Sequence, residues 1–287
     1  MAKKRKKKGT PTALYLILMA LAAVFTFFLS SLLESAPPPA TEPPTAPPAP
    51  TVPQSPYTCD DFTLEGEFLT CNGGSSVIGI DVSHHQGDID WQKVADSGVE
   101  FVMVRLGYRG ISDGSLHADR NVRQNLQGAK DAGLKVGAYF YSQATGVAEA
   151  REEARKALEI LGDFTLDLPL AFDWEIESRT ENVDMQTATD CAIAFCTVIE
   201  DTGSDTMIYF NSYQARQRLD LLQLTAYPWW LAMYTLDGDF PCRFDIWQYT
   251  QTGTVPGITG DVDINVMLTD FLPMSLRERE ATVAIPR

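Results

Sequence analysis

The chain has 287 residues, of which 45% are apolar and 21% are charged, and this length can supply the core of one large domain or two small ones. It carries 23 basic and 38 acidic side chains, and six of the basic ones lie in residues 3–8, so the rest of the chain has a net charge of −21. Proteins that bind nucleic acids need a basic surface that displaces counterions from phosphates. The composition therefore excludes nucleic acid as an expected partner.

The N-terminal segment has the pattern of a membrane anchor. Residues 13–33 are a run of 21 without a charge, and a helix needs about 20 apolar residues to cross a bilayer. Because basic residues of segment 1–12 precede this run and Glu34 follows it, the positive-inside rule predicts a cytoplasmic N-terminus and an exported remainder at the cell membrane. The alternative is a secreted protein with a cleaved signal peptide, whose apolar region is usually about 7–15 residues long.

A proline-rich linker is expected over residues 34–56. Ten of the 17 prolines of the chain lie in 36–56, which favours extended polyproline II structure over a helix or a sheet. The segment is either a stiff spacer or a disordered tether. A short segment with two cysteines, 57–76, separates it from the main domain.

The five cysteines suggest at most one crosslink. Cys59 and Cys71 bracket a short loop, and outside the cell a disulfide between them would stabilise the fold. Cys191 and Cys196 lie five apart on an expected helix, where they point in different directions and are expected to be core thiols; Cys242 is left over. No Cys-x-x-Cys pair occurs, so no zinc site is expected.

The main domain, 77–272, alternates apolar strands with helical patterns, and a tail follows over 273–287. The expected strands are 77–82, 101–106, 135–141, 168–174, 207–210, 229–233, 245–249 and 262–266. The expected helices are 91–97, 119–132, 146–161, 185–201 and 212–221. Apolar strands joined through helices indicate a parallel sheet covered on both faces. Since the last three strands lack full helices between them, the pattern predicts an α/β, TIM-like (β/α)5(β)3 barrel.

Four acidic side chains fall at the ends of predicted strands. They are Asp81, Asp173, Glu175 and Asp263. In a barrel of this type, reactive side chains lie at the C-terminal ends of the strands. Residues two apart on a strand share one face, so Asp173 and Glu175 point the same way. Clustered carboxylates raise one another's pKa, which yields the proton donor that glycosidic cleavage needs. A divalent metal site is the rival, but with three histidines in the chain no metal or cofactor is expected.

Four motifs in this order resemble glycoside hydrolase family 25, the muramidases (lysozymes) of bacteria and phages. They are GIDVSHHQGDIDW at 79–91, LAFDWE at 170–175, WQY at 247–249 and VDIN at 262–265. The resemblance covers about 79–266 and implies the same barrel. It also implies hydrolysis of the β-1,4 bond between N-acetylmuramic acid and N-acetylglucosamine in peptidoglycan glycan strands, by an enzyme expected to be monomeric.

The resemblance also assigns roles. Glu175 matches the general acid, and Asp173 matches the acid that orients the 2-acetamido group or polarises its neighbours. Asp81 and Asp263 match carboxylates that stabilise positive charge on the sugar, while the nucleophile, an Asp or the substrate's acetamide, stays open.

Sugar contacts are implied for Tyr139, Tyr209 and Gln248. Trp229 and Trp230 alternate along a predicted strand, so at most one of them faces the mouth. Two other functions remain open: a non-catalytic peptidoglycan-binding barrel, and a glycosidase of the same mechanism that acts on another polysaccharide such as chitin.

Overall fold

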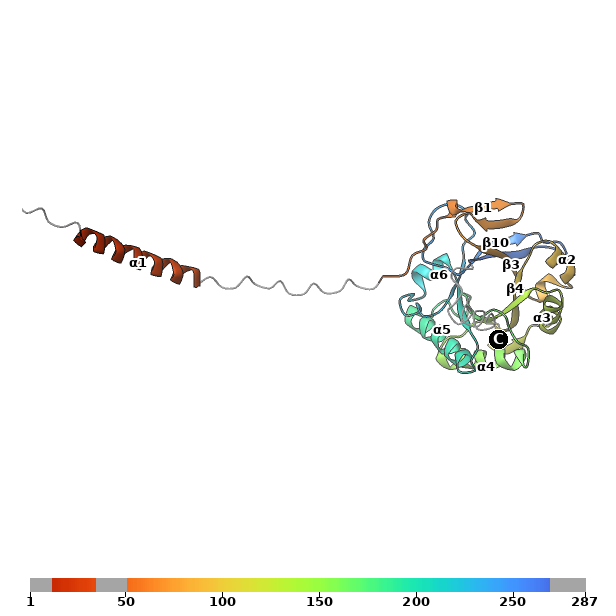
Figure 1. Ribbon diagram of the computed structural model, residues 1–287. Helices are drawn as coiled ribbons and strands as arrows, with labels where there is room; N and C mark the ends of the chain where they lie inside the picture. Colours follow the sequence, from red (N-terminus) through yellow and green to blue (C-terminus); the bar gives the residue numbers. More distant parts are fainter. Residues whose placement is uncertain (1–11, 35–50, 269–287) are drawn as a thin grey trace, which may run out of the picture. The chain divides into compact units, whose positions relative to one another are not determined.

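The computed structural model describes residues 12–34 and 51–268 (Figure 1). The chain divides into two compact units, Met1–Ala49 and Pro50–Arg287. The basic residues 3–8, most of the predicted linker and the predicted tail 273–287 lie outside the described residues.

The first unit contains helix α1 (Thr12–Glu34), which occupies the segment predicted to cross the membrane. Within residues 12–34 and 51–268, however, no helix combines the length and the hydropathy that a bilayer span requires. The structure therefore does not confirm the predicted transmembrane helix.

The second unit is built on a closed β-barrel. Its strands are β3 (Ser76–Val82), β4 (Phe101–Arg109), β6 (Lys135–Ser142), β7 (Leu170–Trp174), β8 (Thr206–Asn211), β9 (Trp229–Ala232), β10 (Ile246–Gly253) and β11 (Val262–Leu268). They pair in the order β3-β11-β10-β9-β8-β7-β6-β4, and a further pairing of β3 with β4 closes the ring. The short strand β5 (Leu116–Ala118) adds to the edge of β4. All eight predicted strands are present in this ring.

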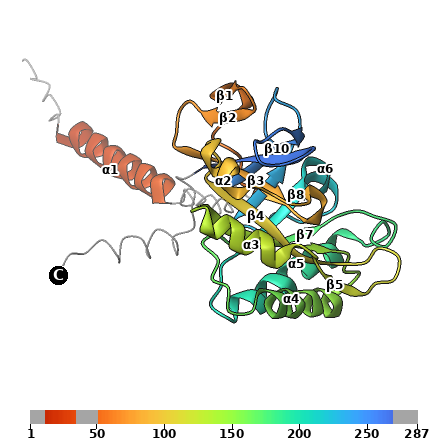
Figure 2. The ribbon, with the colours of Figure 1, turned by 90° about the vertical axis from the view of Figure 1, so that its right-hand side faces the viewer.

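Five helices cover the outside of the first part of the barrel (Figures 1 and 2). They are α2 (Trp91–Asp96), α3 (Val122–Asp131), α4 (Val147–Leu161), α5 (Met185–Glu200) and α6 (Ser212–Gln217). Side-chain caps begin several of them: Asp184 accepts a 2.8 Å bond from the backbone N–H of Thr187 at the start of α5. Each helix follows one barrel strand from β3 to β8, so the predicted (β/α)5(β)3 architecture is confirmed.

The direction of the last strand differs from the prediction. β11 runs antiparallel to both of its neighbours, β10 and β3, whereas the other barrel pairings are parallel. The connection from β10 to β11 is too short for a helical crossover, and a short connection joins antiparallel strands. As a result the beginning of β11, rather than its end, lies beside the C-terminal end of β3.

A hairpin covers part of the barrel that has no helix. Strands β1 (Phe62–Glu65) and β2 (Phe68–Cys71) pair antiparallel. The Phe62 ring packs edge-on against Trp247 of β10, with ring centroids 5.1 Å apart. The Tyr249 hydroxyl donates to the carbonyl of Glu67 over 2.8 Å and accepts from the backbone N–H of Leu69. The hairpin thus supplies apolar cover where the five helices stop.

The expected disulfide is not formed. Cys59, in the short helix η1 (Cys59–Asp61), and Cys71, at the end of β2, are both free and buried. Both belong to the large hydrophobic cluster and pack there as small apolar side chains. Cys191 and Cys196 are fully buried thiols, as predicted.

The barrel interior is packed with side chains rather than open. A separate cluster that includes Phe101, Met103 and Met267 fills it. Small residues make room for these side chains: a Cβ at Gly79 would lie 2.3 Å from the Phe101 ring, and one at Gly137 would lie 2.4 Å from the Met103 sulfur. Because side chains fill the interior, a ligand can bind only at the mouth of the barrel, where the strands end.

Candidate active site

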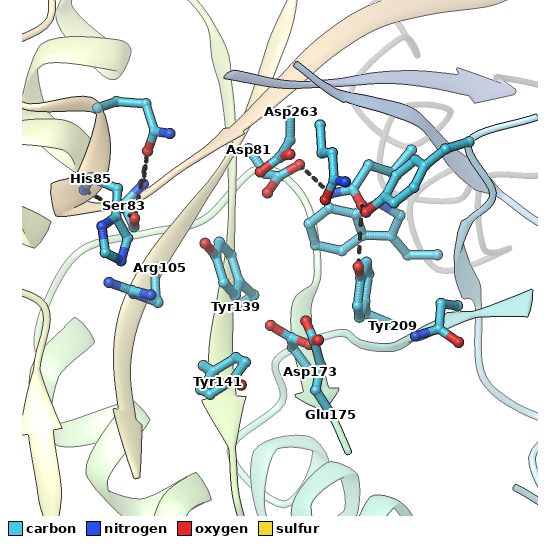
Figure 3. Close-up of a pocket in the computed structure, with 16 residues that line it drawn as sticks. Asp81, Ser83, His85, Arg105, Tyr139, Tyr141, Asp173, Glu175, Tyr209 and Asp263 are labelled. Carbon is cyan, nitrogen blue, oxygen red and sulfur yellow. Dashed lines mark hydrogen bonds between the residues drawn. The ribbon is translucent and has the colours of Figure 1, made fainter. Parts of the chain in front are cut away.

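A cavity of about 370 Å³ opens at the mouth of the barrel (Figure 3). All seven residues predicted from the sequence line it: Asp81, Asp173, Glu175, Asp263, Tyr139, Tyr209 and Gln248. The other lining residues are Ser83, His85, Gln86, Arg105, Tyr141, Asn211, Trp230, Tyr234 and Gln251. The strand ends therefore bring together every candidate residue in one place.

Local strand geometry sets the direction of each acid. Asp173 lies in β7 and Glu175 follows the last residue of that strand, so both point into the cavity. Trp174 between them points outward and is fully buried, and its indole N–H donates to the carbonyl of Ala144 over 2.9 Å. This alternation fixes the Asp-x-Glu pair as a unit.

A network of hydrogen-bonded side chains surrounds Asp81. Its Oδ2 accepts hydrogen bonds from the side-chain amides of Gln248 at 2.8 Å and Asn265 at 2.9 Å. The Gln248 oxygen in turn accepts from the hydroxyls of Tyr209, at 3.1 Å, and Tyr234, at 2.8 Å. These bonds orient both amides with their N–H groups towards the carboxylate.

A hydrogen bond to its side-chain oxygen also orients the amide of Asn265. Its side-chain oxygen accepts a 2.8 Å bond from the indole N–H of Trp230, and the residue is fully buried. Trp230 is thus the tryptophan of the pair that lines the cavity, whereas Trp229 belongs to the outer core.

Burial raises the pKa of all four acids, and the charges of neighbouring carboxylates raise it further in Asp173, Glu175 and Asp263. Burial, followed by the charges of Glu177 and Asp81, raises the pKa of Glu175 to about 7. Burial and the neighbouring Asp81 raise the pKa of Asp263 to about 9. Burial raises the pKa of Asp173 well above its ordinary value, with Glu175 as the next cause.

Asp81 differs from the other three acids. Burial raises its pKa as well, but the hydrogen bonds from Asn265 and Gln248 act against that increase. It is therefore the acid in the cavity whose ionised form the protein stabilises by direct donors.

The backbone around Glu175 is fixed from two sides. Its carbonyl accepts hydrogen bonds from the Thr180 hydroxyl, at 2.7 Å, and from the Gln143 side-chain amide, at 3.1 Å. Because Gln143 is itself fully buried, it holds the strand end in place rather than contacting solvent.

Several lining residues escaped the sequence interpretation. Arg105 is the one charged residue in the predicted strand 101–106, and a charge within that apolar run is the signal that identifies it. Tyr141 follows Tyr139 by two positions on β6, so the same face rule would have identified it. Asn211 is the last residue of β8, and Tyr234 lies two residues after the end of β9; the sequence located both strand ends only approximately.

Comparisons with known proteins agree on one family. The model of "Glycosyl hydrolases family 25" matches residues 80–258. Two relatives are each 27% identical: the autolytic lysozyme of Clostridium acetobutylicum, covering 65% of this chain and 54% of the relative, and lysozyme M1 of Streptomyces globisporus, covering 67% of each.

A solved structure has the same fold. The modular autolysin LytC from Streptococcus pneumoniae, in complex with a synthetic peptidoglycan ligand, superposes with a TM-score of 0.58 at 27% identity, over 67% of this chain and 46% of that one. The chain spans about half the length of this autolysin and of the Clostridium relative.

Proposed function

This chain belongs to the glycosyl hydrolases of family 25, and we propose that it is a muramidase, acting as a monomer on the β-1,4 bond between N-acetylmuramic acid and N-acetylglucosamine in peptidoglycan. The observation that carries the proposal is the convergence of four carboxyl groups with raised pKa values on one cavity of about 370 Å³. The relatives named as lysozymes, and the autolysin with its peptidoglycan ligand, support the same substrate.

Glu175 is the proposed general acid. With a pKa raised to about 7, it holds a proton near neutral pH and can give it to the glycosidic oxygen as the bond breaks. The fixed carbonyl of Glu175 keeps its side chain at the edge of the cavity.

Asp81 is the proposed stabiliser of positive charge on the sugar, since its ionised form accepts two amide hydrogen bonds. Asp263, whose pKa is about 9, stays neutral at pH 7 and donates to Asp81. The resemblance implies that Asp81 and Asp263 both stabilise the sugar as ionised carboxylates; we propose that only Asp81 does so.

Asp173 is the proposed partner of the 2-acetamido group. Its Oδ1 is buried and has no hydrogen-bond partner among the described residues. A buried carboxyl oxygen without a donor is costly unless a ligand supplies one, and the amide N–H of the substrate is such a donor. Binding of that amide would orient the acetamide next to the anomeric carbon.

The test is product analysis with a matched pair of variants. The purified protein should release fragments of peptidoglycan whose new reducing end is N-acetylmuramic acid, identified by mass spectrometry. Glu175→Gln should lower the rate by about 10²–10⁴-fold. Glu159→Gln removes an exposed carboxylate on α4 whose ion-pair partner among residues 51–268 is Lys156, and it should leave the rate unchanged.

Two results would contradict the proposal. One is binding to cell walls without any new reducing ends, which would favour a non-catalytic receptor. The other is a Glu175→Gln variant as active as the parent.

We also propose that the barrel acts outside the cytoplasm and is held at the cell membrane by the N-terminal segment. The support is the sequence alone: the basic cluster at 3–8, then 21 residues without charge. Full-length protein in the membrane fraction is the expected result. A shortened protein in the medium would instead indicate secretion.

A further inference from the structure

A second groove adjoins the candidate active site. Its volume is about 630 Å³, and it shares four lining residues with the first cavity: His85, Arg105, Tyr141 and Glu175. Its remaining lining residues are His84, Tyr108, Arg109, Gly110, Ile111 and Ser112. Glu175 is the only acid among the ten, so the groove differs in charge from the acidic cavity beside it.

The outer wall of this groove is the turn between β4 and β5. Arg109 at the end of β4 fixes this turn to helix α4: its Nε donates to Glu153 over 2.7 Å and one Nη donates to the Glu149 carbonyl over 3.0 Å. The other Nη donates to the Gly114 carbonyl at 2.8 Å. A buried ion pair with these extra bonds holds the wall in one position.

Arg105 stands at the junction of the two cavities. Its Nε and Nη2 donate to Asp119 at 3.0 and 2.8 Å, and Nη2 also contacts His84 Nδ1. The Asp119 side chain is completely buried behind it. Nη1 makes no hydrogen bond to any residue of 51–268, so one edge of an oriented guanidinium is left to a ligand.

Glu175 lines both cavities, so a glycan chain cleaved at Glu175 can occupy one cavity on each side of the broken bond. Asp81, the proposed stabiliser of positive charge on the sugar, and its neighbour Asp263 line only the first cavity. In the view of Figure 3, Arg105 and His85 lie on the opposite side of Tyr139 from Tyr209. A general acid protonates the oxygen between two sugars, so the sugar beyond that oxygen must extend away from Asp81, past Glu175.

We propose that the groove lined by Arg105, Tyr141 and Ile111 binds the reducing-side part of the glycan, the sugars that leave after cleavage, and that Arg105 pairs with a carboxylate carried by one of them. This assignment rests on the proposed function, because it takes Glu175 as the acid. Hydrogen-bond donors and cations predominate in the groove, and the half-buried Tyr141 ring lies beside them, which is the chemistry that binds an acidic amino sugar.

The test uses a charge placed on the groove wall. Ile111 is 38% exposed, so Ile111→Glu places an acid at an exposed position of the groove wall. Leu222→Glu is the matched control, because Leu222 is also 38% exposed and lines neither cavity. Arg105→Gln is less informative alone, since it also removes the partner of buried Asp119.

The substrate is an octasaccharide from peptidoglycan glycan strands, labelled at its reducing end. Ile111→Glu should lower kcat/KM about tenfold, the order of one charge-assisted hydrogen bond. It should also shift cleavage towards bonds that leave a shorter labelled fragment, because fewer sugars are then held on the reducing side. Amidating the substrate carboxylates should abolish the tenfold difference, and Leu222→Glu should match the parent.

The outcomes separate the two proposals. If the parent cleaves no octasaccharide, the proposed function itself fails. If the parent cleaves it and Ile111→Glu behaves as Leu222→Glu does, or shifts cleavage in the opposite direction, the groove assignment is overturned. A penalty that persists on the amidated substrate would overturn the pairing of Arg105 with a carboxylate.

Discussion

Asp81 and Asp263 are direct partners across the antiparallel pairing of β3 and β11, and both side chains line the same cavity. Two ionised carboxylates in such positions would repel each other. The structure resolves this conflict by unequal environments. Gln248 and Asn265 donate to Asp81, whereas burial and the Asp81 charge raise the pKa of Asp263 to about 9.

The two acids should therefore respond differently to the same substitution. Asp263→Asn keeps a neutral donor of the same size opposite Asp81, so we expect kcat/KM on solubilised peptidoglycan to stay within about tenfold of the parent. Asp81→Asn removes the proposed charge and places an amide against two other amides, so we expect a loss of at least about 10²-fold. Equal losses in the two variants would contradict this division of roles.

The pH dependence of activity should report on Glu175. A general acid must be protonated in the free enzyme, so kcat/KM should fall as the pH rises through about 7. After burial, the Glu177 charge is the next cause of that raised pKa. Glu177→Gln should therefore move the alkaline limb of the profile to lower pH. A limb that moves to higher pH, or does not move, would exclude Glu177 as a cause.

The free energy of unfolding should decrease between pH 5 and pH 8. An acid whose pKa is higher in the folded chain stabilises the fold fully below its unfolded pKa, and this contribution is lost as the pH rises through the folded value. For Asp263 the window runs from 3.8 to about 9, and for Glu175 from 4.5 to about 7. Acids with lowered pKa values, such as Asp119 and Asp184, change their contribution only at lower pH.

Thermal unfolding of the parent and of Asp263→Asn at pH 5, 6, 7 and 8 tests this linkage. One such group changes the stability by up to about 1.4 kcal/mol per pH unit. The Tm of the parent should fall towards pH 8, and the slope should be shallower in the variant. Parallel slopes would show that Asp263 has the same pKa in both states.

The barrel could be predicted from the sequence because its strands are short apolar runs and its helices have clear ends. The direction of β11 could not, since an apolar run reads the same in a parallel and an antiparallel strand; only the short connection from β10 carried that information. For the same reason the sequence groups Asp263 with acids at the C-terminal ends of strands, although it lies at the N-terminal end of β11. Its position beside Asp81 follows from the pairing, not from its order in the strand.

The sequence predicts the site residues that lie at strand ends. It does not predict those whose orientation depends on residues far away in the sequence. Arg105 reaches the cavity mouth only because Asp119 and His84, far from it in sequence, orient its guanidinium. Cys59 and Cys71 illustrate the reverse case. Their spacing permits a covalent loop, but both are free thiols buried in the hydrophobic cluster, and spacing along the chain does not set the distance between two side chains.

The β1–β2 hairpin should be an integral part of the barrel's stability. The Phe62 ring is buried against Phe240, Phe244 and Trp247, with centroids 5.1–6.3 Å apart. Phe62→Ala should lower the free energy of unfolding by about 3–5 kcal/mol, measured by urea denaturation. Leu64→Ala is the control on the same strand, because Leu64 is 48% exposed, and it should cost less than about 0.5 kcal/mol. Equal and small effects of the two variants would mean that the hairpin only rests on the barrel, and a protein beginning at residue 77 would then keep its full stability.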